Sequence, residues 1–219
     1  MYTIRDLYDL NHTQAAEYLS QFTFPWEALK GIKDEIIRLG ESLDKTQYNE
    51  IAPQVWVHVT ATVAPTAFLG APCIIGAKTE VRHGAFVRGS ALVGEGCVVG
   101  NSVELKNVIL FDSVQVPHYN YVGDSILGYK SHMGAGSITS NVKSDKTLVV
   151  IREGEESMPT QRKKVGAILG DYVEVGCNSV LNPGTVVGPH SNVYPTSSVR
   201  GTVPPYHIFK NQNEIISKK

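Results

Sequence analysis

A spacing of six residues separates aliphatic positions along most of the chain. The run starts at Ile51 and meets no polar residue: Val57, Val63, Leu69, Ile75, Val81, Val87, Val93, Val99, Leu105 and Phe111. The same phase returns at Leu169 and continues to Val199. A small side chain, such as Ala85 or Cys97, stands four residues after most of these anchors.

One hexad is too short to bury its own apolar side chain, so the hexads must stack on copies of themselves as a β-solenoid. Glycine follows many anchors, which fits corners where the backbone turns sharply. Glycine pairs such as that in 134–136 therefore belong to corners, since no Gly-Lys-Ser/Thr sequence of a phosphate loop follows them. Cys73 and Cys97 fall at the small positions, so we expect both in the core.

The period divides the chain into three parts. Residues 1–48 lack hexads and predict an α-helical cap, whose main helix begins at Pro25 and ends near Gly40. We expect this cap to cover the open end of the solenoid. Residues 49–203 form the solenoid, and residues 204–219 form a C-terminal tail.

Two interruptions break the repeat. Pro117 stands where the anchor after Phe111 is due, and the next anchors, Val122 and Leu127, show that the spacing shortens to five. A regular fold tolerates such a break at a cost, so these positions are candidates for function. The polar segment 141–164 predicts an excursion loop, either functional or disordered.

Two cations mark one side of the predicted solenoid. Arg88 and Lys106 each follow an anchor and lie 18 residues apart, which is one coil if three hexads make a turn. Like charges directly opposite each other are destabilising unless an anion lies between them. The pair therefore indicates a phosphate site. The alternative is two solvated cations with carboxylates such as Glu104 nearby.

His118 lies inside the first interruption, next to Pro117. A neutral imidazole is suited to take a proton from an attacking amine or hydroxyl, because its unperturbed pKa is about 6.5. A lone histidine is more often a surface residue, so the position of His118 in the register break is what makes it a candidate general base.

Three segments carry a resemblance to a known family: VGNSVELK (99–106), HYNYVGD (118–124) and GAGSITSN (134–141). They resemble, in order, the acetyltransferase half of bifunctional N-acetylglucosamine-1-phosphate uridyltransferases, within the hexapeptide-repeat acyltransferase superfamily. The resemblance covers about residues 85–200. It implies a left-handed parallel β-helix that forms a homotrimer and transfers acetyl from acetyl-CoA to the amine of an amino-sugar 1-phosphate such as glucosamine 1-phosphate.

The resemblance also implies roles for individual residues. His118 matches the general base, and the acceptor contacts match Arg88, Lys106, Tyr121, Asn141 and Lys146, with Lys143 as the competitor of Lys146. The acetyl-CoA contacts match Ala135 and Cys177, and Lys210 is a basic residue placed to meet the cofactor's phosphates. His132 and Cys177 stand where bacterial members have asparagine and serine, which leaves the identity of the acceptor sugar open.

The uridyltransferase half is not expected, because only about fifty residues precede the hexads. The loop at 141–164 and the Arg162-Lys163-Lys164 sequence after it are similar to archaeal-type relatives, some of which accept more than one amino sugar. Two rivals remain. A γ-carbonic-anhydrase-like metalloenzyme needs two histidines five residues apart, and Gly123 stands where the second would be. A noncatalytic scaffold would keep the repeats without turnover.

Composition narrows the partners. Twenty basic and 21 acidic residues give a net charge of -1, which offers no reason to expect nucleic acid or an anionic membrane. No signal peptide and no long apolar span are evident, so we expect a cytoplasmic protein. Three cysteines without CxxC spacing support neither a disulfide framework nor a zinc site, and no metal is expected.

Overall fold

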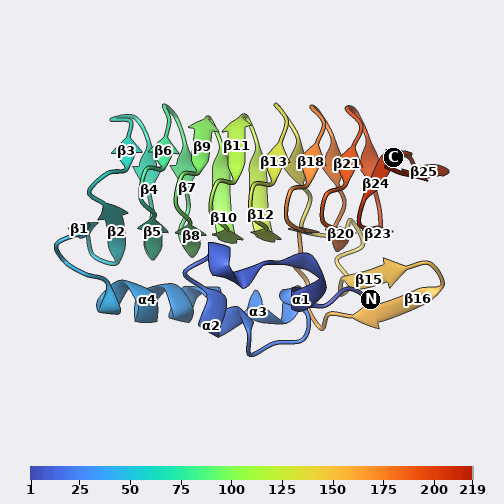
Figure 1. Ribbon diagram of the computed structural model, residues 1–219, viewed down its shortest axis with the longest axis horizontal. Coiled ribbons are helices and arrows are strands. Elements are labelled where there is room, and N and C mark those ends of the chain that lie inside the picture. The colour runs from blue at the N-terminus through green and yellow to red at the C-terminus, as the bar shows by residue number, and fades with distance from the viewer. Residues whose placement is uncertain (219) are drawn as a thin grey trace.

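Strands of successive coils lie on the three sides of a prism, forming a left-handed parallel β-helix of about nine turns (Figure 1). The computed structural model describes residues 1–218. The first side contains β2 (Val55–His58), β5 (Cys73–Ile75), β8 (Ala91–Val93), β17 (Ala167–Leu169), β20 (Thr185–Val187) and β23 (Thr202–Val203). The second side contains β3 (Thr62–Val63), β6 (Glu80–Val81), β9 (Val98–Asn101), β11 (Gln115–His118), β13 (His132–Met133), β18 (Glu174–Val175), β21 (Asn192–Val193) and β24 (His207–Asn211). The third side contains β4 (Phe68–Leu69), β7 (Phe86–Val87), β14 (Ile138–Thr139), β19 (Val180–Leu181) and β22 (Ser198–Val199). Two longer strands, β10 (Glu104–Leu110) and β12 (Tyr121–Leu127), bend from the third side onto the first.

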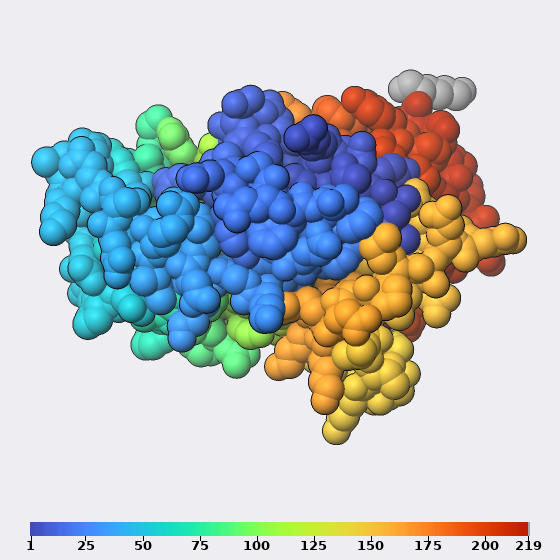
Figure 2. Space-filling model, turned by 90° about the horizontal axis from the view of Figure 1, so that it is seen from below, coloured from blue at the N-terminus to red at the C-terminus, as the bar shows by residue number. Residues whose placement is uncertain are grey.

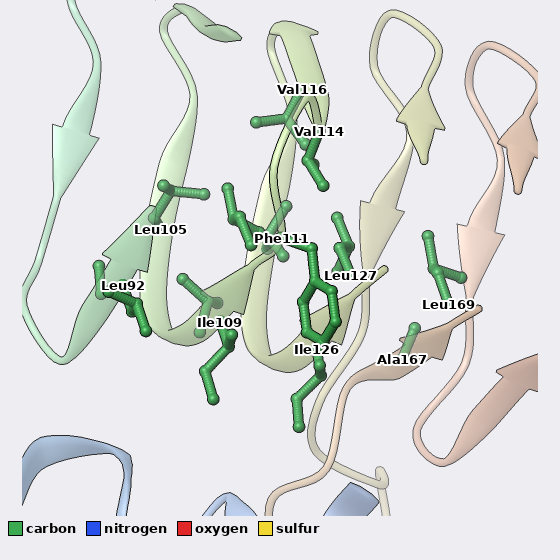
Figure 3. Close-up of a cluster of buried hydrophobic side chains, with 14 of the residues drawn as sticks. Leu92, Leu105, Ile109, Phe111, Val114, Val116, Ile126, Leu127, Ala167 and Leu169 are labelled. Atoms are coloured by element: carbon green, nitrogen blue, oxygen red, sulfur yellow. The ribbon is translucent and has the colours of Figure 1, made fainter. Parts of the chain in front are cut away.

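The predicted anchors fill the interior of the prism. Leu105 and Leu169 are buried, and Figure 3 shows them among other buried apolar side chains of the coils. Cys73 and Cys97 are buried as expected, and burial raises the pKa of both thiols to about 12. Neither thiol is therefore available as a nucleophile near neutral pH.

The coil length changes at the first interruption. Val93 pairs with Leu110, and Leu110 pairs with Leu127, so coils of 17 residues replace coils of 18. The prediction that Phe111 is an anchor is wrong, because the shortened turn puts Leu110 in the anchor column. Phe111 is still buried, and its ring packs 4.9 Å from the ring of Tyr8 in the N-terminal segment.

The N-terminal segment lies along the first side of the prism (Figures 1 and 2), not over its open end as expected. Its elements are α1 (Ile4–Leu7), the 3₁₀ helix η1 (Leu10–His12), α2 (Ala16–Leu19), α3 (Pro25–Ala28) and α4 (Ile32–Ser42). The outward-facing positions of the first side form a buried aliphatic column that includes Ile74, Leu92, Ile109, Ile126 and Ile168. The helices lie here because this column needs cover.

The expected single helix from Pro25 to Gly40 is two helices. Pro25 begins α3, but α4 continues past Gly40 to Ser42. A Cβ on Gly40 would lie 2.2 Å from the Trp56 ring, so this glycine allows close packing and does not end the helix.

Each end of the solenoid carries an antiparallel strand. At the start, β1 (Tyr48–Ala52) pairs with β2, and Ile51 is exposed, so the prediction of Ile51 as the first anchor is wrong. At the finish, β25 (Glu214–Ser217) pairs with β24. Both strands cover an otherwise open edge of a sheet.

The excursion at 141–164 contains a hairpin of β15 (Val150–Glu153) and β16 (Glu156–Pro159). Val149 and Ile151 are buried, and both approach Gly184 on the solenoid. The return segment is held by backbone bonds, in which Val165 N–H donates to the Asn141 carbonyl at 3.1 Å and Gly166 N–H donates to the Asp124 carbonyl at 2.8 Å.

Candidate active site

His118 ends β11 at the edge between the second and third sides, and its side chain is exposed. The corner residues of successive coils stack along this edge. Tyr119 N–H donates to the Asn101 carbonyl at 2.9 Å, and Gly136 N–H donates to the His118 carbonyl at 3.0 Å. His118 is therefore bracketed by one coil that ends at Asn101 and another that turns at 135–136.

Asn120 fixes the corner that carries His118. Its buried side chain accepts the His118 N–H at 3.1 Å and donates to the carbonyls of Gly134 at 2.9 Å and Ser137 at 3.0 Å. A buried amide that meets several fixed partners holds one backbone geometry. Asn120 thus ties the His118 corner to the next coil, a role that the sequence alone did not reveal.

Ala135 and Cys177 continue the same edge. Asn178 N–H donates to the Ala135 carbonyl at 2.8 Å, so the corner with Cys177 stacks on the corner with Ala135. Cys177 is exposed, and a groove of about 420 Å³ opens beside it on the second side, lined in part by Gly134, Tyr194 and Lys218. The three residues expected near base and cofactor therefore lie on successive coils of one edge.

Arg88 and Lys106 lie next to each other on the third side, because Val87 pairs with Leu105 and Arg88 N–H donates to the Leu105 carbonyl at 2.9 Å. Each of the two side chains forms an ion pair with a different carboxylate. Arg88 Nη1 lies 2.9 Å from Glu104, and Lys106 Nζ lies 2.9 Å from Asp124. The hydrogen bond to Glu104 raises the pKa of Arg88.

Asp124 is the centre of a buried polar cluster at the edge between the third and first sides. Its carboxylate accepts bonds from Lys106 at 2.9 and 3.1 Å, Asn107 at 3.0 Å and Asn141 at 2.6 Å. Its side chain is only 2% exposed. Asp124 lies in the HYNYVGD segment (118–124), but the family resemblance implied no role for it. A polar residue two positions after an anchor in three successive coils, as Asn107, Asp124 and Asn141 are, was the available signal.

Tyr121 joins this cluster from the third side. Asn141 Nδ2 donates to the Tyr121 hydroxyl at 3.2 Å. A Cβ at position 123 would lie 2.4 Å from that hydroxyl, so Gly123 leaves the space in which Tyr121 and Asn141 meet. Burial, followed by the charge of Asp124, raises the pKa of the Tyr121 phenol, which therefore stays protonated and able to donate.

Two of the expected lysines lie away from these groups. Lys146 is exposed in a turn that its N–H closes on the Lys143 carbonyl at 3.0 Å, and Lys143 itself pairs with Asp145 at 3.2 Å. Lys210 on β24 pairs with Glu214 in the C-terminal hairpin. Within residues 1–218, no hydrogen bond or salt bridge joins Lys146 to the Asp124 cluster.

Within the described residues, no group of three His, Cys, Asp or Glu side chains has the arrangement of a metal site. None of the described helices is long and apolar enough to cross a membrane.

The coil geometry and the edge residues define a hexapeptide-repeat left-handed β-helix protein. A protein-family comparison then identifies the family. The model of the GMPPB C-terminal domain matches residues 72–203, and this chain belongs to that family.

Curated relatives match about half of the chain. A bifunctional sugar-1-phosphate nucleotidylyltransferase/acetyltransferase of Sulfurisphaera tokodaii is 31% identical over 109 residues, which are 50% of this chain and 27% of the relative. The bifunctional protein GlmU of Methanocaldococcus jannaschii is 33% identical over 104 residues, 48% of this chain and 25% of the relative. The chain thus spans about a quarter of the length of these two relatives. Among solved structures, the polySia-specific acetyltransferase NeuO is 15% identical with a TM-score of 0.49, covering 72% of this chain and 82% of NeuO.

Proposed function

We propose that this protein is an acetyl-CoA-dependent N-acetyltransferase whose acceptor is an amino sugar with a phosphate on its anomeric carbon, such as glucosamine 1-phosphate. The observation that carries the proposal is the stacking of His118, Ala135 and Cys177 on one edge, beside the third side with Arg88 and Tyr121. Two curated relatives are similar to about half of this chain, and one is named as an acetyltransferase and the other as GlmU. Their names support acetyl transfer as the reaction class.

His118 acts in this proposal as the general base. A protonated amine cannot attack a thioester, so the acceptor nitrogen must lose a proton while its bond to the acetyl carbon forms and the bond from that carbon to the CoA sulfur breaks. The exposed imidazole, held by Asn120 through the backbone, is available to take that proton.

The acceptor's phosphate is proposed to bind at Arg88 and Lys106. Its arrival would compete with Glu104 and Asp124 for these cations, and Glu104 is the easier to displace because its side chain is 35% exposed, against 2% for Asp124. Tyr121 and Asn141 then offer a hydroxyl and an amide to the sugar. Lys146 remains a proposed acceptor contact, with Lys143 as its competitor.

Acetyl-CoA is proposed to lie along the edge that carries Ala135 and Cys177. Small side chains at 135, 136 and 177 leave the backbone open to a thioester and its pantetheine arm, and the groove beside Cys177 continues toward the C-terminal hairpin with Lys210. We further propose a homotrimer, in which the side of a neighbouring prism would close this edge. Sedimentation of a stable monomer at micromolar concentration would contradict the trimer.

The test is His118→Ala, measured by CoA release with a panel of amino-sugar 1-phosphates. Loss of a positioned base should lower kcat about 100-fold to 10,000-fold. The control is His83→Ala, because His83 is also exposed and lies on the same edge two coils earlier. A His118→Ala enzyme that keeps more than about a tenth of parental kcat would exclude His118 as the essential base. A parent that releases no CoA with any acceptor would favour the noncatalytic scaffold.

A further inference from the structure

A hollow of about 450 Å³ adjoins the Asp124 cluster on the side away from His118. Three separate segments line it. The solenoid edge contributes Ser90, Lys106, Asn107 and Asp124; the N-terminal segment contributes Leu29 and Lys30; the return segment contributes Arg162, Lys163 and Lys164. Five of these nine residues are cationic, and Asp124 is the one acidic residue among them.

The charge of the hollow is not neutralised by its surroundings. Lys106 is paired with Asp124, but within residues 1–218 no salt bridge joins Lys30, Arg162, Lys163 or Lys164 to a carboxylate. Four cations that converge from two walls repel one another. A ligand with several negative charges would reverse that repulsion.

Both added walls are held in place by specific bonds. Asn107 Nδ2 donates to the Leu29 carbonyl at 3.1 Å and also to Asp124, which ties the N-terminal wall to the polar cluster. The return wall is held by the backbone bonds of Val165 and Gly166. A Cβ on Gly166 would lie 2.1 Å from the Gly123 carbonyl oxygen, so only glycine lets this segment approach so closely.

We propose that this hollow binds a diphosphate or a longer phosphate chain. Five cationic side chains on three segments carry more charge than one phosphate neutralises, whereas two or more linked phosphates place negative charge across the hollow. The chain could belong to the acceptor, as in an amino sugar linked through diphosphate to a nucleoside, or to a separate nucleotide. The first source rests on the proposed function, and the second does not.

The test is calorimetric titration with inorganic pyrophosphate and, for comparison, inorganic phosphate at low ionic strength. Pyrophosphate should bind more tightly than phosphate. Lys30→Gln and the double variant Lys163→Gln/Lys164→Gln remove charge from different walls, and each should weaken pyrophosphate binding about tenfold or more, since charge-assisted bonds are lost. The control is Lys33→Gln, an exposed lysine of the same N-terminal segment that does not line the hollow.

Equal pyrophosphate affinity in the parent and in both charge-removing variants would overturn the proposal, as would the absence of pyrophosphate binding to the parent. Competition assigns the source. Displacement of pyrophosphate by glucosamine 1-phosphate would support the site as part of the acceptor site, and simultaneous binding would support it as a separate nucleotide site. Failure of acetyl transfer with every acceptor would refute the proposed function and leave this titration interpretable.

Discussion

Replacing Asp124 with asparagine tests how much burial matters to an ion pair on this face. The third side and its edge carry two ion pairs with the same 2.9 Å separation, Arg88 with Glu104 and Lys106 with Asp124. They differ in burial, since the Asp124 side chain is 2% exposed and that of Glu104 is 35% exposed. The comparison therefore changes solvent exposure and the number of hydrogen-bond donors, while the distance between the paired charges is held constant.

The expected loss follows from what Asp124 accepts. Asparagine keeps the shape but offers one acceptor oxygen, and its amide faces the donors of Lys106, Asn107 and Asn141. Breaking a buried pair costs about 3–5 kcal/mol, and partial exposure of Lys106 puts this case near the lower figure of about 3 kcal/mol. The urea midpoint, compared at one protein concentration, should fall by about 1 M.

Glu104→Gln is the matched control and should leave the midpoint near that of the parent, because solvent screens the exposed pair. The double variant Lys106→Met/Asp124→Asn should lose less than the sum of its single variants, with a coupling of about 2 kcal/mol. Equal midpoint shifts in Asp124→Asn and Glu104→Gln would refute the reasoning from burial.

Three further expectations concern the same framework. Gly123→Ala should raise the acceptor's KM with little change in the melting temperature, since the new Cβ displaces the movable end of Tyr121; an unchanged KM would remove Tyr121 from the acceptor site. Asn120→Ala should lower the kcat of the folded enzyme, because His118 loses its backbone support, and should leave acceptor KM almost unchanged; an unchanged kcat at an unchanged melting temperature would contradict this role. Asp171 accepts the backbone N–H groups of Asp9 and Tyr129, each at 2.7 Å, and burial raises its pKa above 3.8. Its contribution to stability is therefore present below pH 3.8 and is lost as pH rises through the raised folded pKa. In Asp171→Asn that decline should disappear, and identical urea midpoints against pH for variant and parent would contradict it.

The six-residue period was sufficient to predict the solenoid, its interior and the buried cysteines. In a stacked repeat, the phase decides which position of each hexad faces the interior. The aliphatic anchors from Val57 to Leu105 allow only one phase, because a shift by one residue would turn every anchor outward. The break near Pro117 was also readable. The residue at which the break begins could not be predicted, because Leu110 and Phe111 are both apolar. Only the folded structure shows that Leu110 is the anchor and that Phe111 packs against Tyr8.

The placement of the helices depended on tertiary structure. Outward-facing aliphatic residues such as Ile74, Leu92 and Ile109 recur once per coil, on one of three sides. The six-residue period therefore does not include them. The buried column they form is continuous only after the coils stack. Its cover by α4 and the preceding helices then follows from the removal of apolar surface from water.

The candidate site shows the same division between sequence and tertiary structure. Sequence patterns alone marked His118 and Arg88 as candidates with suitable chemistry, and the family resemblance added Tyr121. The 18-residue spacing, which equals one regular coil, aligned Arg88 with Lys106. The sequence could not pair Lys106 with Asp124, or bring Lys30 and Lys163 to that cluster. Those approaches depend on a 17-residue coil, an excursion and a helical segment whose separations along the chain follow no repeat, so only the folded chain determines which charges line one hollow.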